Sequence, residues 1–423
     1  MTTASTAALG HRFRALRHRN FRLFWSGQLV SLVGTWMQTV AQGWLMHRLT
    51  DSAFMLGLLG FAQFAPATFL SLWAGVIADR FDKRRLLLIT QGLAFAQAIA
   101  MAVLSSTGHI RPWMVLVLAF LLGIVNAFDL PTRQSAIVEM VDDREDLSNA
   151  IALNSAEFNA ARILGPAVAG VTLAAIGETG CFWINAVSYL AVLYSLSQMK
   201  LERRTPVRTD ATLGSMREGV AYVMRTESIR NLLILLAICG GLGYQYTILL
   251  PVYTRTILHA DASAFGALTA SFGVGSLIAA LSMTRALDRW TLRRNLLVGL
   301  TSAGLGLGAF AWSRWLPLTL ATGLIAGYGL ILYVASTNTL VQMTTEDRYR
   351  GRVMSLYTFM FIGTTPLGSL LAGAVAERAG APAATSLCAV FLLGGALWVS
   401  ARLRFLRGQE RARAEVAAPE KVG

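Results

Sequence analysis

Ionisable side chains are scarce in the long apolar stretches of this 423-residue chain, so the few that occur there are the first candidates for chemistry. Asp129, Glu157 and Arg162 fall well inside such stretches, and Arg133 falls at the edge of one. An ionisable group in hydrocarbon costs at least about 2.5–3.5 kcal/mol on insertion scales and usually faces a partner or a water-filled cavity. A carboxyl group shielded from water favours its neutral form. Asp129 and Glu157 are therefore candidate proton carriers, and the residues leave open which one acts.

Helical spacing indicates which of these groups can meet. Asn126, Asp129 and Arg133 recur at i, i+3 and i+7 and therefore share one helix face. Glu157 and Arg162 point about 140° apart at about 100° per residue, so we do not expect them to pair. These charges fit two interpretations equally well, a permanent ion-pair network or an acid that takes up and releases a proton.

A polar stripe follows the first apolar stretch and is a candidate substrate wall. Its members lie within about 100° of arc on one helix. A stripe facing lipid is unfavourable, so it should line a water-filled cavity or another helix, and we favour the cavity. Side chains of the seventh apolar stretch add aromatic and hydrogen-bonding surface. The stripe comprises Gln28, Ser31, Thr35, Gln38, Thr39 and Gln42, and the seventh stretch adds Tyr244, Gln245, Tyr246 and Tyr253.

The elements that position these residues are predicted to be transmembrane helices. With 55% hydrophobic and 14% charged residues and a mean hydropathy of +0.53, the chain is far more apolar than an ordinary globular domain. A helix needs about 20 residues to cross about 30 Å of hydrocarbon. Spans of this length are predicted near 21–45, 54–78, 86–107, 112–133, 149–175, 181–199, 229–254, 264–284, 295–312, 316–338, 351–376 and 383–403.

An internal repeat divides these spans into two sets of six. The segment Asp79-Arg80-Phe81-Asp82-Lys83-Arg84-Arg85 is echoed by Asp288-Arg289-Trp290-Thr291-Leu292-Arg293-Arg294. Such a duplication fixes the architecture that local motifs must fit. The sequence therefore predicts an all-α integral membrane protein with twelve transmembrane helices in two six-helix, pseudo-symmetric halves. The predicted parts are an N-terminal segment 1–20, a first bundle 21–199, a central loop 200–228, a second bundle 229–404 and a tail 405–423.

The distribution of basic residues predicts the orientation of the chain. Although the net charge is +14, most of the 37 Lys and Arg fall in the loops on the side of the two termini. This positive-inside bias predicts an inner (plasma) membrane protein with both termini in the cytoplasm. Nucleic-acid binding is disfavoured because no basic patch is interleaved with stacking aromatics outside the spans.

Several other functions are disfavoured. Cys181, Cys239 and Cys388 show no metal or disulfide spacing and are expected to be packing residues. No phosphate-binding loop is present, so we expect neither nucleotide nor other cofactor, and no metal. The longest hydrophilic stretch, near 200–226, is too short for a catalytic domain, which disfavours an enzyme. Within it, one apolar face predicts a helix lying on the membrane surface; that face comprises Leu213, Met216, Val220, Val223 and Met224.

The spans and several short motifs together resemble the major facilitator superfamily, over nearly the whole chain. Within it, the motifs resemble the enterobactin-exporter and macrolide-efflux branch of drug:proton antiporters. Asp82 stands where that superfamily usually has Gly. The motifs are Gly75-Val76-Ile77-Ala78-Asp79-Arg80, Asp129-Leu130-Pro131-Thr132-Arg133-Gln134, Leu153-Asn154-Ser155, Gly165-Pro166 and Arg350-Gly351-Arg352-Val353-Met354-Ser355.

Two of these motifs carry expectations about movement. Gly75 is expected to let two helices approach closely, and the resemblance implies that Asp79 pairs across the cytoplasmic interface as a gate. The gating set comprises Gly75, Asp79, Arg80, Lys83, Arg84 and Arg85, with a second copy at Asp288 and Arg289 that lacks the glycine; topology anchoring alone would account for residues 83–85. The segment Gly165-Pro166-Ala167-Val168-Ala169-Gly170 resembles the antiporter motif of exporters, where proline and small residues permit a kink.

The resemblance implies a secondary transporter that exports a siderophore, a macrolide or another drug-like molecule by alternating access, in exchange for protons. Its partners would be that small molecule, protons and membrane lipid. Two alternatives stay open: a lipid or lysolipid flippase of the same fold, and a membrane receptor or scaffold without turnover.

Overall fold

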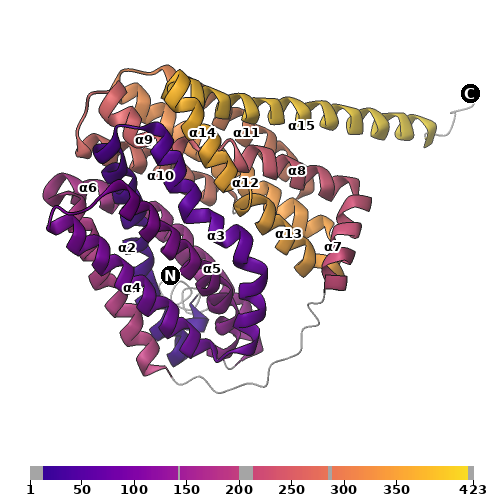
Figure 1. Cartoon of the computed structure of the whole chain (residues 1–423). Helices are drawn as coiled ribbons and strands as arrows, with labels where there is room; N and C mark the ends of the chain where they lie inside the picture. The colour runs from indigo at the N-terminus through magenta and orange to yellow at the C-terminus, as the bar shows by residue number, and fades with distance from the viewer. Residues whose placement is uncertain (1–12, 142, 200–212, 284–287, 418–423) are drawn as a thin grey trace, which may run out of the picture.

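The structure, a computed structural model, describes residues 13–141, 143–199, 213–283 and 288–417, which form helices joined by short turns (Figure 1). The N-terminal half contains η1 (Arg14–Arg17), α2 (Arg19–Thr50), α3 (Ala53–Arg80), α4 (Lys83–Ser106), α5 (Pro112–Met140) and α6 (Arg144–Gln198). Helix α6 supplies two predicted spans, because the chain turns at Gly177, whose φ of 70° is a left-handed conformation that glycine adopts without strain.

The C-terminal half has two broken spans. The predicted span 229–254 is divided by a turn at residues 242–245, and the predicted span 351–376 by a turn at residues 363–364. Hydropathy does not register such breaks, because the residues on both sides are apolar. The helices are α8 (Glu227–Gly241), α9 (Tyr246–Val252), η2 (Tyr253–Ile257), α10 (Ala262–Met283), α11 (Arg289–Trp312), α12 (Leu316–Thr344), η3 (Asp347–Tyr349), α13 (Arg350–Ile362), α14 (Thr365–Ala379) and α15 (Ala381–Ala417).

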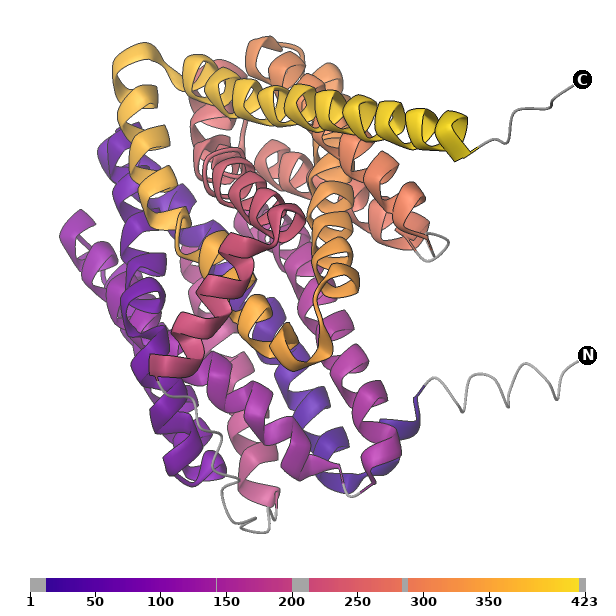
Figure 2. The ribbon, with the colours of Figure 1, turned by 90° about the vertical axis from the view of Figure 1, so that its right-hand side faces the viewer.

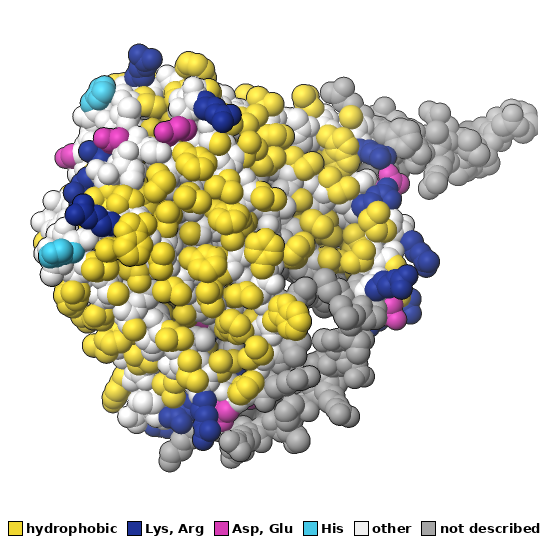
Figure 3. All heavy atoms as spheres, viewed as in Figure 1, with side chains coloured by type: hydrophobic (Ala, Val, Ile, Leu, Met, Phe, Trp, Pro, Cys, Tyr) yellow, Lys and Arg dark blue, Asp and Glu magenta, His cyan; other side chains and the backbone are white. Residues whose placement is uncertain are grey.

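The surface fits a membrane environment. Hydrophobic side chains cover the middle of the face seen in Figure 3, and charged side chains gather at its edges. Among the described residues, ten helices are long and apolar enough to cross a membrane. Helix α6 counts once among them although it turns at Gly177, and α2, with 32 residues, lies outside them because of its polar stripe. The predicted all-α membrane fold is confirmed.

The two halves meet at one end of the molecule. Helix α14 lies beside α3, and α10 lies beside α6 (Figures 1 and 2). Glycine makes both contacts possible: a Cβ on Gly170 would lie 2.0 Å from Cα of Gly266, and a Cβ on Gly57 would lie 2.9 Å from Cα of Gly373. From this sealed end the helices of the halves run apart, those of the N-terminal half toward the bottom of Figure 1 and those of the C-terminal half toward its right.

The helix of the central loop, α7 (Leu213–Arg225), packs on the C-terminal half. Tyr222 stacks on Tyr349, with ring centroids 4.2 Å apart, and Arg352 donates to Glu218 at 2.7 Å. Val223 is buried, whereas Val220 and Met224 are exposed, so the predicted apolar face is divided between protein and surroundings. The side chains of Leu213 and Met216 lie outside the described residues.

Candidate functional site

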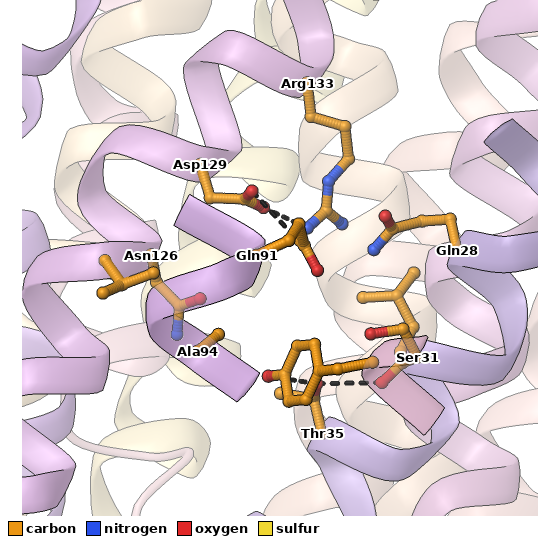
Figure 4. A pocket seen from close by; sticks show the side chains of 11 residues that line it. Gln28, Ser31, Thr35, Gln91, Ala94, Asn126, Asp129 and Arg133 are labelled. Atoms are coloured by element: carbon orange, nitrogen blue, oxygen red, sulfur yellow. Dashed lines mark hydrogen bonds and ion pairs between the residues drawn. The ribbon is translucent and has the colours of Figure 1, made fainter. Parts of the chain in front are cut away.

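A small polar pocket lies inside the N-terminal half, between α2, α4, α5 and α6 (Figure 4). Its volume of about 40 Å³ is room for about three water molecules at about 10–15 Å³ each. Sites for drug-sized molecules enclose roughly 300–1,000 Å³. The pocket therefore suits water and protons rather than an organic substrate. Its lining consists of Gln28, Ser31, Leu32, Thr35, Gln91, Ala94, Val125, Asn126, Asp129, Arg133 and Tyr189.

Asp129 is a fully partnered acid at the wall of this pocket. Its side chain is 2% exposed and forms an ion pair with Arg133, one turn further along α5. Two donors from α4 complete its partners: Thr90 Oγ1 and Gln91 Nε2 both donate to Asp129 Oδ1 at 2.8 Å. The predicted shared face of Asn126, Asp129 and Arg133 is confirmed, since all three line the pocket.

Arg133 connects this acid to α2. With the amide oxygen of Gln28 turned toward the guanidinium, Gln28 accepts hydrogen bonds from both terminal nitrogens of Arg133, at 3.0 and 3.1 Å. The Nε of Arg133 and the Oε1 of Gln91 are buried and have no hydrogen-bond partner among the described residues. Water in the pocket can bond to both, because both side chains line it.

Glu157 is an acid in the opposite situation. Its side chain, on α6, is 1% exposed, and neither carboxyl oxygen has a hydrogen-bond partner among the described residues. Arg133 is the cation whose charge acts on it. The expectation that Glu157 and Arg162 do not pair is met, and Arg162 is half-buried. One cation therefore stands near two buried acids, of which it bonds directly to Asp129.

The polar stripe of α2 is not a single cavity wall. Gln28, Ser31 and Thr35 line the pocket, but Gln38 and Gln42 are fully buried between helices. Gln38 donates to Gln97 at 2.9 Å and accepts from Asn185 at 2.7 Å, and Gln42 accepts from Gln63 at 3.0 Å. Thr39 donates to the Thr35 carbonyl of its own helix. The cavity prediction was wrong for Gln38 and Gln42, because neighbouring helices satisfy polar groups that water cannot reach.

The predicted polar surface of the seventh span is also largely internal. Gln245 is 3% exposed, donates to the Gly241 carbonyl at 2.6 Å and accepts from Ser369 at 2.9 Å, so it joins the break at residues 242–245 to α14. Tyr246 is 4% exposed and stacks on Phe272, with centroids 4.3 Å apart.

The other two tyrosines of this span differ in exposure. Tyr253 is buried and donates to the Ala311 carbonyl at 3.2 Å. Tyr244 is half-buried and stays a substrate candidate.

The basic residues of the gating motif have specific partners within their own half. Lys83 pairs with Glu139 on α5, and Arg84 donates to the carbonyls of Leu196 and Ser197 at 2.8 and 2.7 Å. These bonds tie the start of α4 to the ends of α5 and α6. Lys83 and Arg84 therefore make specific contacts in addition to any effect of their charge on membrane orientation. Arg85 is exposed. The side chains of Asp79, Arg80 and Arg289 lie outside the described residues.

In this conformation two residues of the gating motif do not make the contacts predicted for a closed cytoplasmic gate. Among the described residues, a Cβ on Gly75 would meet no heavy atom within 4 Å, so no close helix approach is seen there. Asp288 begins a helix rather than reaching across the halves: it accepts from the backbone of Trp290 and Thr291 at 2.9 and 2.8 Å and from the Thr291 hydroxyl. These hydrogen bonds, that of the Thr291 side chain first, lower the pKa of Asp288.

The structural counterpart of Asp288 in the first half is Asp82. Asp82 precedes α4 and accepts from the Arg85 N–H at 2.8 Å, as an N-cap does. Asp79, which the sequence repeat aligns with Asp288, is instead inside α3. Relative to the repeat, α4 therefore begins three residues later than α11. Each of the two helices begins directly after its own capping residue, Asp82 or Asp288.

The antiporter-like segment acts through packing. Helical dihedral angles continue across residues 165–170, and the departure from helix in α6 is at Gly177, so the predicted kink is not a break in the helix. A Cβ on Gly165 would lie 2.4 Å from the Trp36 Cβ on α2. Gly170 faces the other half, as described above, and the Pro166 carbonyl accepts from Thr269 at 3.5 Å. This segment is therefore part of the sealed end.

Sequence reasoning missed the donors that hold the central acid. Thr90 and Gln91 are polar residues inside the apolar stretch 86–107, and that contrast was the available signal. Helical spacing gives the face of one helix but not the neighbour that the face meets, so their partners could not be derived.

Comparisons with known proteins agree with this architecture. Residues 11–421 match the family described as transmembrane secretion effector, of the major facilitator superfamily. The staphyloferrin A transporter of Staphylococcus aureus is 29% identical over 360 residues, covering 84% of this chain and 89% of that protein. The multidrug efflux pump Tap of Mycolicibacterium fortuitum is 28% identical (83% and 88% covered), and macrolide efflux protein A of Streptococcus pyogenes is 23% identical (85% and 90% covered).

Solved structures share the fold. The nucleoside transporter NupG superimposes with a TM-score of 0.69 at 13% identity, covering 92% of this chain and 99% of that one. A bacterial homologue of the lysosomal transporter Spinster, in its inward-facing and unoccupied conformation, gives 0.70 at 15% identity, covering 92% and 96%. The chain is a multi-pass membrane protein of a transporter family and not an enzyme, and it belongs to the transmembrane secretion effector family of the major facilitator superfamily.

Proposed function

We propose that this protein is a secondary transporter that exports a small, partly apolar organic molecule by alternating access, in exchange for protons. Relatives named as a staphyloferrin A transporter, a multidrug efflux pump and a macrolide efflux protein support a siderophore or a drug-like substrate. The excess of Lys and Arg in the loops on the side of the termini supports a plasma-membrane protein with both termini in the cytoplasm.

Under this orientation the structure corresponds to an inward-facing state. The contacts of Gly57 with Gly373 and of Gly170 with Gly266 are at the end opposite the cytoplasmic loops. The helices run apart toward the cytoplasmic end (Figure 1). Substrate would enter between the halves, beside half-buried Tyr244, because the pocket inside the N-terminal half is too small for it.

The observation that supports proton exchange best is the isolated carboxyl group of Glu157. Three hydrogen-bond donors, Arg133, Thr90 and Gln91, hold Asp129. A second ionised acid at Glu157 would be a buried charge without a hydrogen bond, which costs several kcal/mol. A proton on Glu157 removes this cost. The three side chains Asp129, Arg133 and Glu157 then carry no net charge together. Glu157 is therefore the proposed proton carrier, and Asp129 with Arg133 is the fixed pair beside it.

Proton release requires Arg133 to move relative to Glu157. Its Nε has no hydrogen-bond partner among the described residues, so after such a movement the Nε–H can donate to Glu157. A shift of α5 against α6 that brings them together stabilises the ionised acid and releases the proton. Each charge that crosses the membrane contributes about 2.3 kcal/mol per 100 mV to transport.

Counterflow in proteoliposomes tests this function. Purified protein would be assayed with a macrolide, a hydroxycarboxylate siderophore, a cationic dye and a lysolipid, with and without an imposed pH gradient. We expect exchange of at least one organic solute without a gradient and its accumulation only with one. Movement of lysolipid alone, independent of pH, would instead identify a flippase, and movement of no probe would contradict the transporter proposal.

A further inference from the structure

The N-terminus of α3 receives a cap from the opposite half. Ser52 is the N-cap of its own helix and accepts from the Met55 N–H at 3.2 Å. The Phe54 N–H, one of the first N–H groups that have no partner within a helix, donates instead to Glu377 Oε2 at 3.1 Å. The Ser52 hydroxyl donates to the same oxygen, also at 3.1 Å.

Close packing of α3 against α14 places the exposed Glu377 carboxylate beside the N-terminus of α3. Ser369, Gly373 and Glu377 are spaced by four residues along α14 and so share one face. A Cβ on Gly57 would lie 2.6 Å from the Ser369 carbonyl and 2.9 Å from the Gly373 Cα, so α3 and α14 touch along that face. Glu377 continues the row in the last turn of α14, beside the first turn of α3. The contact of Glu377 with the N-terminus of α3 thus belongs to the packed interface of the sealed end.

Other polar contacts of the sealed end differ from this one. Arg255 lies 3.7 Å from Asp51, and Thr256 lies 3.4 Å from the His47 ring nitrogen. Those contacts join side chains only, whereas Glu377 also accepts from a backbone N–H of the opposite half. Glu377 also places a carboxylate at the positive end of a 28-residue helix, where backbone N–H groups and the helix dipole favour negative charge.

We propose that Glu377 is a gating residue of the sealed end, capping α3 only while the two halves are closed there. Opening this end separates α14 from α3, and the cap is lost with the separation. The cap therefore sets the balance between the two access states without touching the pocket that holds Asp129 and Arg133. This inference rests on the alternating access proposed above.

Distances between spin labels at the sealed end test the proposal. Thr107 and Arg314 are exposed residues in turns at that end, one in each half. Both would be changed to Cys in a background whose native cysteines, all buried, are replaced by Ser. Removing a helix cap changes an equilibrium by about three- to tenfold. Glu377→Ala should therefore raise the open fraction by about that factor, and Glu377→Gln should raise it less, because the amide keeps an acceptor oxygen.

Asp143→Ala is the matched control, because the exposed Asp143 caps α6 within a single half, where it accepts from the Glu145 N–H at 3.0 Å. It should leave the label distances unchanged. An unchanged distribution in Glu377→Ala, or an equal shift in Asp143→Ala, would overturn the gating role.

Counterflow separates this inference from the transport proposal. With any dye that the unmodified protein exchanges, Glu377→Ala should change the maximal exchange rate and leave the KM within about twofold. If the unmodified protein exchanges no probe while the labels still shift in Glu377→Ala, the transport proposal fails and the cap stands as a conformational control.

Discussion

The buried charged residues are the strongest indication of function. The sequence identified them but did not predict their contacts. Rarity of charge identified Asp129, Glu157 and Arg133, and spacing placed Asp129 and Arg133 on one face. The difference between the two acids depends on α4, whose Thr90 and Gln91 donate to Asp129. Nothing in the spacing of α5 or α6 specifies that neighbour. Only the structure shows that Glu157 is the acid without a hydrogen-bond partner among the described residues.

Asp129→Asn is expected to destabilise the N-terminal half. Removing one member of a buried ion pair costs about 3–5 kcal/mol, because the remaining charge stays buried. Thermal unfolding in detergent should show a lower melting temperature for Asp129→Asn, and adding Arg133→Gln should restore part of the loss. A double variant as unstable as the sum of the single variants would contradict direct coupling.

A second acid, Asp146 at the start of α6, predicts a pH dependence outside the membrane. Hydrogen bonds from His18 and Arg14, at 3.1 and 2.7 Å, lower the pKa of Asp146 below its ordinary value. A lowered pKa stabilises the fold above the unfolded value of about 3.9, and that stability is lost as the pH falls through the folded pKa. Asp146→Asn should therefore lower the melting temperature at pH 6–8, and the difference should shrink below about pH 4. A difference that persists undiminished in acid would exclude ionic stabilisation.

At the scale of elements, helix number was predictable and helix interruption was not. Twenty-residue apolar stretches correspond to spans, and caps such as Asp82 mark where helices begin. The breaks at residues 242–245 and 363–364 escaped prediction because the residues on both sides of each break are apolar. The sequence showed the small residues of the segment 165–170. Whether such residues form a kink or a helix interface depends on the helix that they face.

Gly170→Ala tests the packing of α6 against α10. The added Cβ would lie 2.0 Å from the Gly266 Cα, too close without separating the helices. We expect a shift toward the state open at the sealed end and a loss of exchange of at least about tenfold. Gly394→Ala is the control, because a Cβ there would meet no atom within 4 Å. Equal effects of both substitutions on exchange and on label distances would refute a specific role for the interface.

At the scale of the whole molecule, the repeat and the charge distribution predicted two halves and their orientation, and the all-α membrane fold is confirmed. The conformation could not be predicted, because two access states of one chain differ by only a few kcal/mol. The structure adds an asymmetry between the halves: the buried acids Asp129 and Glu157 and the polar pocket belong to the N-terminal half, while the C-terminal half supplies Glu377 and the broken helices.

Gradient-driven accumulation by Glu157→Gln is the most direct test of the account. Proteoliposomes would contain the unmodified protein, Glu157→Gln or Glu157→Asp, with a dye that the unmodified protein exchanges. Because an amide cannot carry the proton, Glu157→Gln should exchange the dye within about threefold of the normal rate yet fail to accumulate it under a pH gradient, whereas Glu157→Asp should retain part of the accumulation. Normal accumulation by Glu157→Gln would contradict the assignment of the proton to Glu157.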